Sequence, residues 1–174
     1  MDQKASTNVA QTPSATVLAH ELDVSQNKLS HATAVIKTVH GNIEIKFYPT
    51  VSPNTVSRII QLIGDGFYDG LKFHRVESDF IVQTGDPTGS GRGGTGKKLK
   101  AELSDLQHIL GTVSMARSPS DIDSADSQFY ISLGTLPDLD GKYTIFGQVV
   151  KGLDILKKIS AGDRIISAEF INKK

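Results

Sequence analysis

The chain has 174 residues, of which 38% are hydrophobic and 22% are charged, and its 19 basic residues balance its 19 acidic ones. This composition predicts one soluble globular domain and argues against a protein that binds nucleic acid through a basic surface. The lack of cysteine excludes disulfide bonds and thiolate metal sites, and no apolar run approaches the roughly 18 residues that a membrane-spanning helix needs.

The first 30 residues differ in character from the rest. Residues 1–30 are polar and small, contain Pro13 and follow no sustained hydrophobic period, so we interpret them as a flexible polar segment before a domain over residues 31–174. They lack the basic start and apolar core of a secretory signal, which favours a cytoplasmic protein. Their Ser/Thr/Gln/Ala-rich composition would also suit a periplasmic or exported protein whose signal has been removed.

Two strands are predicted at the start of the domain. Residues 35–39 are rich in β-branched side chains, and residues 42–47 alternate between polar and apolar ones, as in a half-buried strand. A turn at His40-Gly41-Asn42 separates them. The two segments are therefore predicted to form a β-hairpin.

An amphipathic helix is predicted after the hairpin. Ser52 offers a capping side chain and Pro53 suits the first helical turn, while Gly64 and Gly66 end the segment. Between these signals, apolar side chains recur at helical spacing: Val56, Ile59, Ile60 and Ile63.

Short strands separated by glycine-rich turns make up most of the remaining chain. They are expected at residues 71–76, 81–84, 110–115, 128–133, 143–150 and 165–171, with a second helix at residues 153–159. Many short strands with two isolated helices favour a closed or nearly closed β-barrel over an alternating βαβ sheet.

The glycine-rich stretch over residues 85–96 invites a phosphate-binding interpretation, which its details do not favour. A Walker loop needs Gly-Lys followed by Ser or Thr, whereas Gly96 is followed by Lys97-Lys98. A dinucleotide-binding loop needs a βαβ unit, and no helical pattern follows this stretch. We interpret it as a structural loop or as the edge of a substrate site.

Metal and nucleophile chemistry are also disfavoured. The five histidines include no His-x-x-x-His pair, so no metal site is predicted. No Gly-x-Ser-x-Gly elbow supports a Ser/His/Asp triad.

Several separate motifs occur in order along the domain, and together they resemble the cyclophilin family of peptidyl-prolyl isomerases. The resemblance runs from about Ala34 to the C-terminus. It is carried by Phe73-His74-Arg75-Val76, Phe80-Ile81-Val82-Gln83-Thr84-Gly85-Asp86, Ser114-Met115-Ala116-Arg117, Ser127-Gln128-Phe129-Tyr130-Ile131, Leu139-Asp140-Gly141-Lys142-Tyr143 and Phe146-Gly147.

The resemblance implies a mainly β fold, a closed eight-stranded antiparallel β-barrel capped by two α-helices, with a substrate groove on its outer face. By motif position, Arg75 resembles the family's catalytic arginine. The residues that resemble its proline pocket are Phe80, Ile81, Tyr130, Leu139 and Tyr143. Those that resemble its contacts to the substrate backbone are Gln83, Ala116, Arg117 and Gln128, with Gly91 at the neighbouring edge of the groove and Phe129 facing the core.

The implied activity is cofactor-free acceleration of rotation about Xaa-Pro bonds, acting on proline-containing peptides and unfolded protein clients as a monomer that assists folding. A fixed guanidinium suits this reaction, because it can donate a hydrogen bond to the proline nitrogen of the twisted amide and stays charged at any working pH. The alternative is a proline-segment binding module or holdase chaperone that uses the same groove without turnover.

Four positions depart from the common family pattern, one of which is Arg117, where many relatives carry asparagine. Asp138 stands where many relatives carry tryptophan or histidine, and that tryptophan contributes to cyclosporin binding, so we expect weak cyclosporin binding here. Tyr143 replaces a frequent histidine and Ile81 a common methionine, which changes the pocket walls but leaves the arginine in place.

Overall fold

The computed structural model describes residues 32–172, so the segment predicted over residues 1–30 lies outside the described residues. The strands are β1 (Ala32–Thr38), β2 (Gly41–Phe47), β3 (Arg75–Glu77), β4 (Ile81–Thr84), β5 (Thr112–Met115), β6 (Phe129–Ser132), β7 (Ile145–Lys151) and β8 (Ile165–Asn172). The helices are α2 (Pro53–Gly64), the 3-10 turn η1 (Pro137–Leu139) and α3 (Leu153–Leu156). None of the helices in residues 32–172 is long and apolar enough to cross a membrane.

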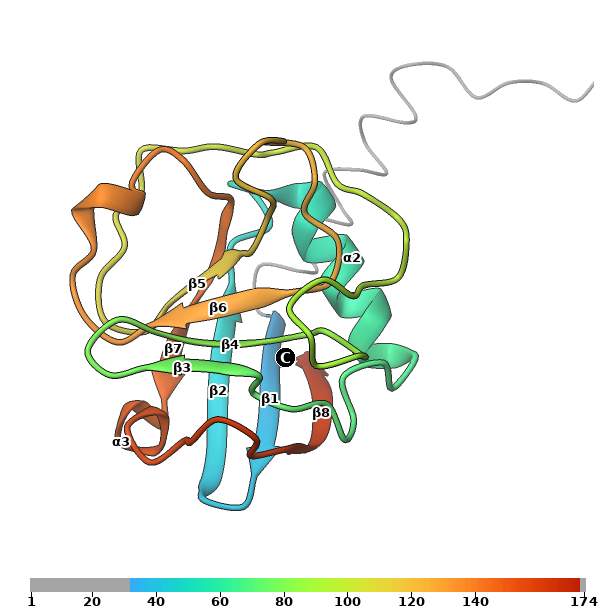
Figure 1. Ribbon diagram of the computed structural model, residues 1–174, viewed down its shortest axis with the longest axis vertical. Coiled ribbons are helices and arrows are strands. Elements are labelled where there is room, and N and C mark those ends of the chain that lie inside the picture. The colour runs from blue at the N-terminus through green and yellow to red at the C-terminus, as the bar shows by residue number, and fades with distance from the viewer. Residues whose placement is uncertain (1–31, 173–174) are drawn as a thin grey trace, which may run out of the picture.

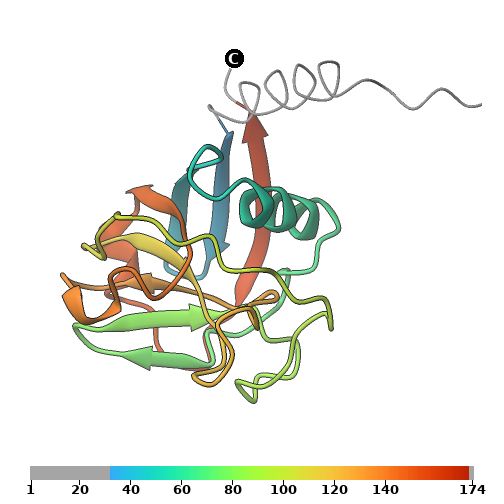
Figure 2. The same cartoon turned by 90° about the horizontal axis from the view of Figure 1, so that it is seen from above.

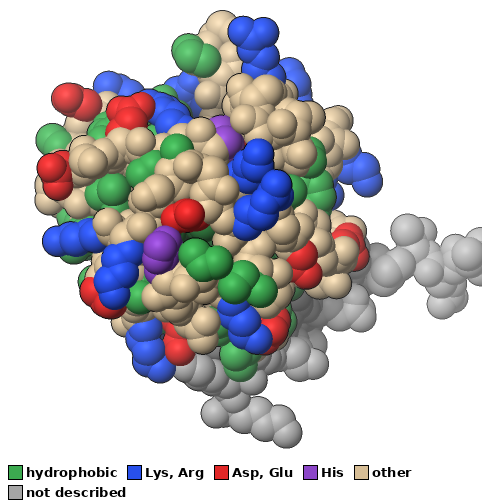
Figure 3. Space-filling model, turned by 60° about the horizontal axis from the view of Figure 1, so that its bottom comes forward, with side chains coloured by type: hydrophobic (Ala, Val, Ile, Leu, Met, Phe, Trp, Pro, Cys, Tyr) green, Lys and Arg blue, Asp and Glu red, His purple; other side chains and the backbone are tan. Residues whose placement is uncertain are grey.

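All eight strands belong to one curled sheet, in the order β3-β4-β6-β5-β7-β2-β1-β8, and every neighbouring pair is antiparallel (Figure 1). The predicted hairpin is present as β1 and β2, with Ile36 opposite Ile43. On the face shown in Figure 3, basic and acidic side chains are interspersed, in keeping with the zero net charge.

The expectation of a closed barrel is wrong, because β3 and β8 form the two ends of the sheet and do not pair. Where they would meet, the structure has one isolated bridge, between Lys72 and Arg164, which precede the two strands. Beside this bridge, backbone hydrogen bonds join residues 70–73 to residues 162–165, such as that from the Phe73 N–H to the Asp163 carbonyl at 2.8 Å, but β3 and β8 themselves form no ladder. The result is a curled half-barrel with two helices.

Helix α2 covers the sheet beside β8 (Figure 2) and buries the apolar face that its sequence predicts. Its N-terminus differs from the prediction. The Ser52 hydroxyl donates to the Ile145 carbonyl instead of capping the helix. The cap comes from Glu102, whose carboxylate accepts the backbone N–H groups of Asn54 and Thr55 at 3.0 and 2.9 Å.

The second helix is shorter than predicted, because regular helix ends at Leu156 and a turn follows. The residue before α3 is Gly152, whose φ of +87° favours glycine, and a Cβ there would lie 2.3 Å from the carbonyl oxygen of Asn42. This close approach fixes α3 against β2.

Strand register divides the side chains of β3, β4, β6 and β5 between two faces. Residues opposite one another on adjacent strands share a face, and the next residue along each strand points to the other face. One row runs through Arg75, Gln83, Tyr130 and Ser114. The next row runs through Val76, Val82, Ile131 and Val113 and packs in or against the hydrophobic core. The first row therefore carries polar and aromatic side chains onto the outer face of the sheet.

Candidate functional site

A pocket of about 190 Å³ opens on this outer face. Nine of the eleven predicted site residues line it: Arg75, Phe80, Ile81, Gln83, Ala116, Arg117, Tyr130, Leu139 and Tyr143. They come from strands β3, β4 and β6, the turn between β3 and β4, the turn η1, and the loops after β5 and before β7. The structure thus brings together residues that lie up to 68 positions apart in the sequence.

Arg75 stands at the mouth of this pocket with about half of its side chain exposed. Its Nε donates to Glu77 Oε1 at 2.7 Å, and its Nη1 lies 3.5 Å from Gln83 Oε1. The guanidinium carbon lies 5.8 Å from the centroid of the Phe80 ring, within range of a cation–π contact. These contacts restrain the guanidinium but leave some of its five N–H groups free to donate.

The walls of the pocket combine apolar and aromatic side chains with the polar side chains of Arg75, Gln83 and Arg117. Tyr130 is 4% exposed, and its ring meets that of Tyr143 edge to face at 5.7 Å between centroids. On the outer side of Tyr143, the Arg117 guanidinium carbon lies 4.7 Å from the ring centroid, and Arg117 Nε donates to the Lys142 carbonyl at 3.1 Å. These contacts hold two facing aromatic rings in a fixed arrangement.

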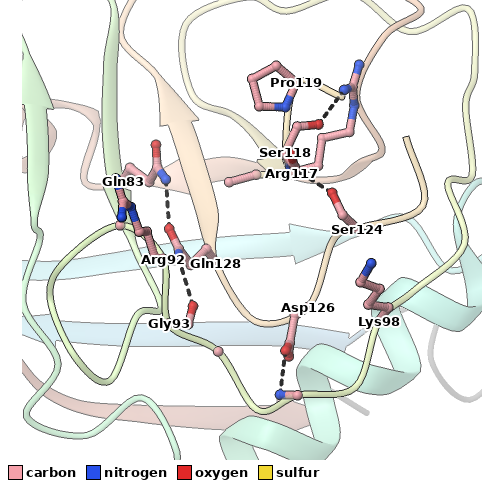
Figure 4. Close-up of a pocket in the computed structure, with 14 residues that line it drawn as sticks. Gln83, Arg92, Gly93, Lys98, Arg117, Ser118, Pro119, Ser124, Asp126 and Gln128 are labelled. Atoms are coloured by element: carbon pink, nitrogen blue, oxygen red, sulfur yellow. Dashed lines mark hydrogen bonds between the residues drawn. The ribbon is translucent and has the colours of Figure 1, made fainter. Parts of the chain in front are cut away.

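The other two predicted residues, Gly91 and Gln128, line a larger groove of about 750 Å³ that shares Gln83, Ala116 and Arg117 with the pocket (Figure 4). Gln83 Nε2 donates to Gln128 Oε1 at 2.9 Å, and Gln128 Nε2 donates to the Gly93 carbonyl at 2.8 Å. Together with the contact between Arg75 and Gln83, this chain links the pocket to the glycine-rich loop. All eleven predicted site residues therefore lie along one continuous surface.

The buried carboxylate of Asp86 orders the first part of the glycine-rich loop, and the carboxylate of Asp126 accepts the backbone N–H of Gly96 at its end, at 2.7 Å. Asp86 Oδ1 accepts the backbone N–H and hydroxyl of Thr88, both at 2.7 Å, and Asp86 Oδ2 accepts the N–H groups of Gly91 at 2.6 Å and Gly93 at 3.1 Å. Burial by itself raises the pKa of the Asp86 carboxyl, but the hydrogen bonds from Thr88, Gly93 and Gly91 outweigh it and hold that pKa well below its usual range. The loop is thus a fixed wall of the groove.

The described residues offer no arrangement suited to a metal, since nowhere in residues 32–172 do three His, Asp or Glu side chains converge. The site is instead an arginine beside an apolar pocket, with amide side chains along its edge. Such a site can bind and polarise a substrate through hydrogen bonds and shape.

Comparison with known proteins decides the family. The sequence model of the cyclophilin-type peptidyl-prolyl cis-trans isomerases matches residues 33–171. The chain belongs to this family. Two curated relatives carry the same activity in their names: an isomerase from Synechococcus elongatus is 41% identical over 79% of this chain and 95% of its own length, and one from Schizosaccharomyces pombe is 46% identical over 74% and 84%.

Solved structures agree with the fold. A cyclophilin-type isomerase from Cryptosporidium parvum superposes with a TM-score of 0.75 at 27% identity, over 82% of this chain and 98% of that one. The cyclophilin AquaCyp293 from Hirschia baltica has a TM-score of 0.71 at 25% identity, over 81% and 74%. The present cyclophilin is accordingly a peptidyl-prolyl cis-trans isomerase.

Sequence motifs did not reveal every residue that shapes the site of this cyclophilin. Asp86 ends a recognised motif, yet its role as the acceptor for the first part of the glycine-rich loop depends on how that loop folds back. His108 lies outside every motif and is fully buried against Tyr130 and Asp140. Its only signal in the sequence is that it precedes β5, which carries no information about its partners.

Proposed function

We propose that Arg75 is the catalytic group of this cyclophilin and acts as a fixed hydrogen-bond donor to the twisted Xaa-Pro amide. The observation that carries the proposal is the position of its guanidinium, restrained by Glu77 and Gln83 at the mouth of an apolar pocket. In this assignment the pocket of Phe80, Ile81, Tyr130, Leu139 and Tyr143 receives the proline ring. Gln83, Ala116, Arg117 and Gln128 hold the substrate backbone, with Gly91 at the groove edge.

The chemistry of the reaction favours such a site. The C–N bond resists rotation because of its double-bond character, with a barrier of about 18–20 kcal/mol. In the twisted transition state that conjugation is lost, and the proline nitrogen becomes pyramidal and able to accept a hydrogen bond. A guanidinium N–H placed to meet this lone pair binds the transition state more tightly than the planar ground state, which lowers the barrier. No nucleophile is needed.

The substrates we propose are proline-containing peptides and the mobile proline segments of unfolded proteins. In support, a related Cryptosporidium parvum cyclophilin was crystallised in the presence of the dipeptide Ala-Pro. The pocket is shallow and continuous with the open groove, so an extended chain can enter without unfolding the enzyme. We also infer weak cyclosporin binding, because Asp138 is exposed beside Leu139 and offers no aromatic surface.

A proline-isomerisation assay tests the role of Arg75. Arg75→Ala should lower kcat/KM by about a hundredfold or more, because a hydrogen-bond donor to the transition state is lost. Arg75→Lys should restore only part of this kcat/KM, because a lysine ammonium lacks the planar set of N–H groups of a guanidinium. Lys46→Ala, which removes the same charge from the exposed surface of β2, is the matched control and should leave the rate unchanged. Equal rates for wild type and Arg75→Ala would refute the assignment.

A further inference from the structure

Directly behind the proline pocket lies a histidine that the proposed reaction does not use. His108 is 0% exposed, and its backbone N–H and both of its ring nitrogens have hydrogen-bond partners. Its backbone N–H and Nδ1 both meet Asp140 Oδ1, at 2.7 and 2.8 Å. Its Nε2 lies 3.0 Å from the hydroxyls of both Tyr130 and Ser114. A buried side chain with this many specific partners is held in one orientation.

The carboxylate decides where the ring proton sits. Hydrogen bonds from the backbone N–H and the ring of His108 hold the pKa of the Asp140 carboxyl below its usual range, so it is ionised at neutral pH and can only accept. Nδ1 must therefore carry a proton and donate it to Asp140, while Nε2 faces the hydroxyls of Tyr130 and Ser114.

The hydroxyl of Tyr130 is suited to meet that nitrogen. Burial raises the pKa of Tyr130 well above its usual range, so its proton is retained. The Ser114 hydroxyl lies at the same distance, 3.0 Å, from His108 Nε2. The sequence of bonds runs from the Tyr130 hydroxyl to the imidazole and from the imidazole to the carboxylate of Asp140.

Contacts between rings connect the same histidine to the pocket walls. The His108 ring stacks on that of Tyr130 at 6.0 Å between centroids and 14° between planes. It meets the ring of Tyr143 edge to face at 6.5 Å. Asp140 directly follows Leu139, a third pocket residue. His108 lines neither the pocket nor the groove, yet its contacts reach three of the pocket's walls.

We propose that His108, oriented by Asp140, is a positioning residue that fixes the Tyr130 ring and so preforms the pocket for the substrate proline. The inference rests on the proposed function, because it assigns Tyr130 to the proline pocket. The walls of a preformed pocket are already ordered before the substrate binds. Binding then loses less conformational entropy and is more favourable. The expected signature is a change in KM that depends on the Tyr130 hydroxyl.

A double-mutant cycle measures this dependence. His108→Leu should raise KM about tenfold with a smaller change in kcat, whereas in a Tyr130→Phe background the same substitution should change KM by less than about twofold, because the hydroxyl that His108 restrains is gone. An equal increase in KM in the wild-type and Tyr130→Phe backgrounds would overturn the proposal, since it would mean that His108 affects binding without acting through the Tyr130 hydroxyl.

A pair of substitutions at Asp140 provides the rescue. Asp140→Ala removes the acceptor and should raise KM as His108→Leu does. Asp140→Asn can keep an oxygen at the position of Oδ1 for both His108 contacts, so its KM should stay within about threefold of wild type. A KM for Asp140→Asn as high as that for Asp140→Ala would contradict the proposal. If His108→Leu does not fold, as judged by thermal melting, Asp140→Ala carries the same test, because its side chain lies partly at the surface.

The test of His108 can be separated from the test of the catalytic role of Arg75. Peptide affinity is measured by NMR titration as well as by KM, so the cycle does not depend on turnover. If Arg75→Ala keeps the wild-type rate, the catalytic assignment fails while the coupling between His108 and Tyr130 is still measured. If Arg75→Ala loses the rate and the coupling is absent, only the inference about His108 fails.

Discussion

Arg75 and Glu77, two residues apart on β3 and hence on the same face, are joined through a single carboxylate oxygen. Glu77 Oε1 accepts from Arg75 Nε at 2.7 Å and lies 2.7 Å from Nη2. Both side chains are about half exposed, so water screens the attraction between their charges. The pair therefore acts mainly by orienting the guanidinium toward the pocket.

Removing this restraint should reduce turnover modestly. We expect Glu77→Ala to lower kcat by about two- to fivefold, in proportion to the small free energy of an exposed ion pair. The effect should shrink at high salt, where the pair already contributes less. Kinetics at low and high ionic strength check this, with Asp154→Ala on the exposed surface of α3 as the control. A rate that is unchanged or higher in Glu77→Ala would contradict it.

Glu102 should be an unusually important surface carboxylate for stability. It accepts two backbone N–H groups of the first turn of α2 and also the side chains of Asn54 and Thr55, at 2.9 and 2.7 Å. Glu102→Ala should lower the free energy of unfolding by about 1–2 kcal/mol, as the loss of a helix cap does.

Chemical denaturation measures this loss. The control is Glu169→Ala, which breaks an exposed ion pair with Lys37 and a long hydrogen bond of 3.4 Å from the Ser167 hydroxyl, and it should lower the free energy of unfolding by less than about 1 kcal/mol. Equal costs for the two substitutions would show that Glu102 does not act as the cap.

Acid should weaken the fold partly through Asp86. Its folded-state pKa is depressed, so the unfolded chain takes up a proton on this group at a higher pH than the folded one does. The resulting stability is fully present above the unfolded value of about 3.9 and is lost as the pH falls from there toward the folded-state pKa.

Unfolding free energies measured between pH 6 and pH 2 test this on the wild type and Asp86→Asn. Asp86→Asn should lower the free energy of unfolding near neutral pH. The difference in that free energy between the variant and the wild type should narrow as the pH falls through about 4. Asp154→Asn, whose carboxylate accepts only one long contact of 3.5 Å from Lys158, should follow the wild-type curve. A gap between wild type and Asp86→Asn that is constant with pH would count against the assignment.

Asp138 should control sensitivity to cyclosporin. The residue is exposed on η1 next to Leu139, and its backbone carbonyl accepts from Lys142 Nζ at 2.8 Å, so its side chain can be exchanged without disturbing that contact. Asp138→Trp should add an apolar contact surface and tighten inhibition by about tenfold or more, as buried aromatic anchors do at interfaces. An inhibition titration checks this, with Asp138→Ala separating the loss of charge from the gain of the ring. Tight inhibition of the wild type would refute the expectation.

The local pattern of the sequence was sufficient for the elements whose form depends on near neighbours. Alternation over residues 42–47 predicted β2, and apolar spacing from Val56 to Ile63 predicted the buried face of α2, because both depend on side chains a few positions apart. Ordered motifs also identified the family, and the eleven predicted site residues all lie among those that line the pocket and its adjoining groove.

Contacts between segments that lie far apart in the sequence could not be predicted from this local pattern. The ends of the curled sheet, β3 and β8, form no ladder with each other, and the cap of α2 comes from Glu102 some 50 positions away. His108 meets Tyr130 across the neighbouring strands β5 and β6. Strand order and register between remote segments follow from how the whole core packs, and no window of the sequence encodes them. The sequence by itself determined the local elements and the family and proposed the site residues, whereas only the tertiary structure decided what holds Arg75 and Tyr130 in place.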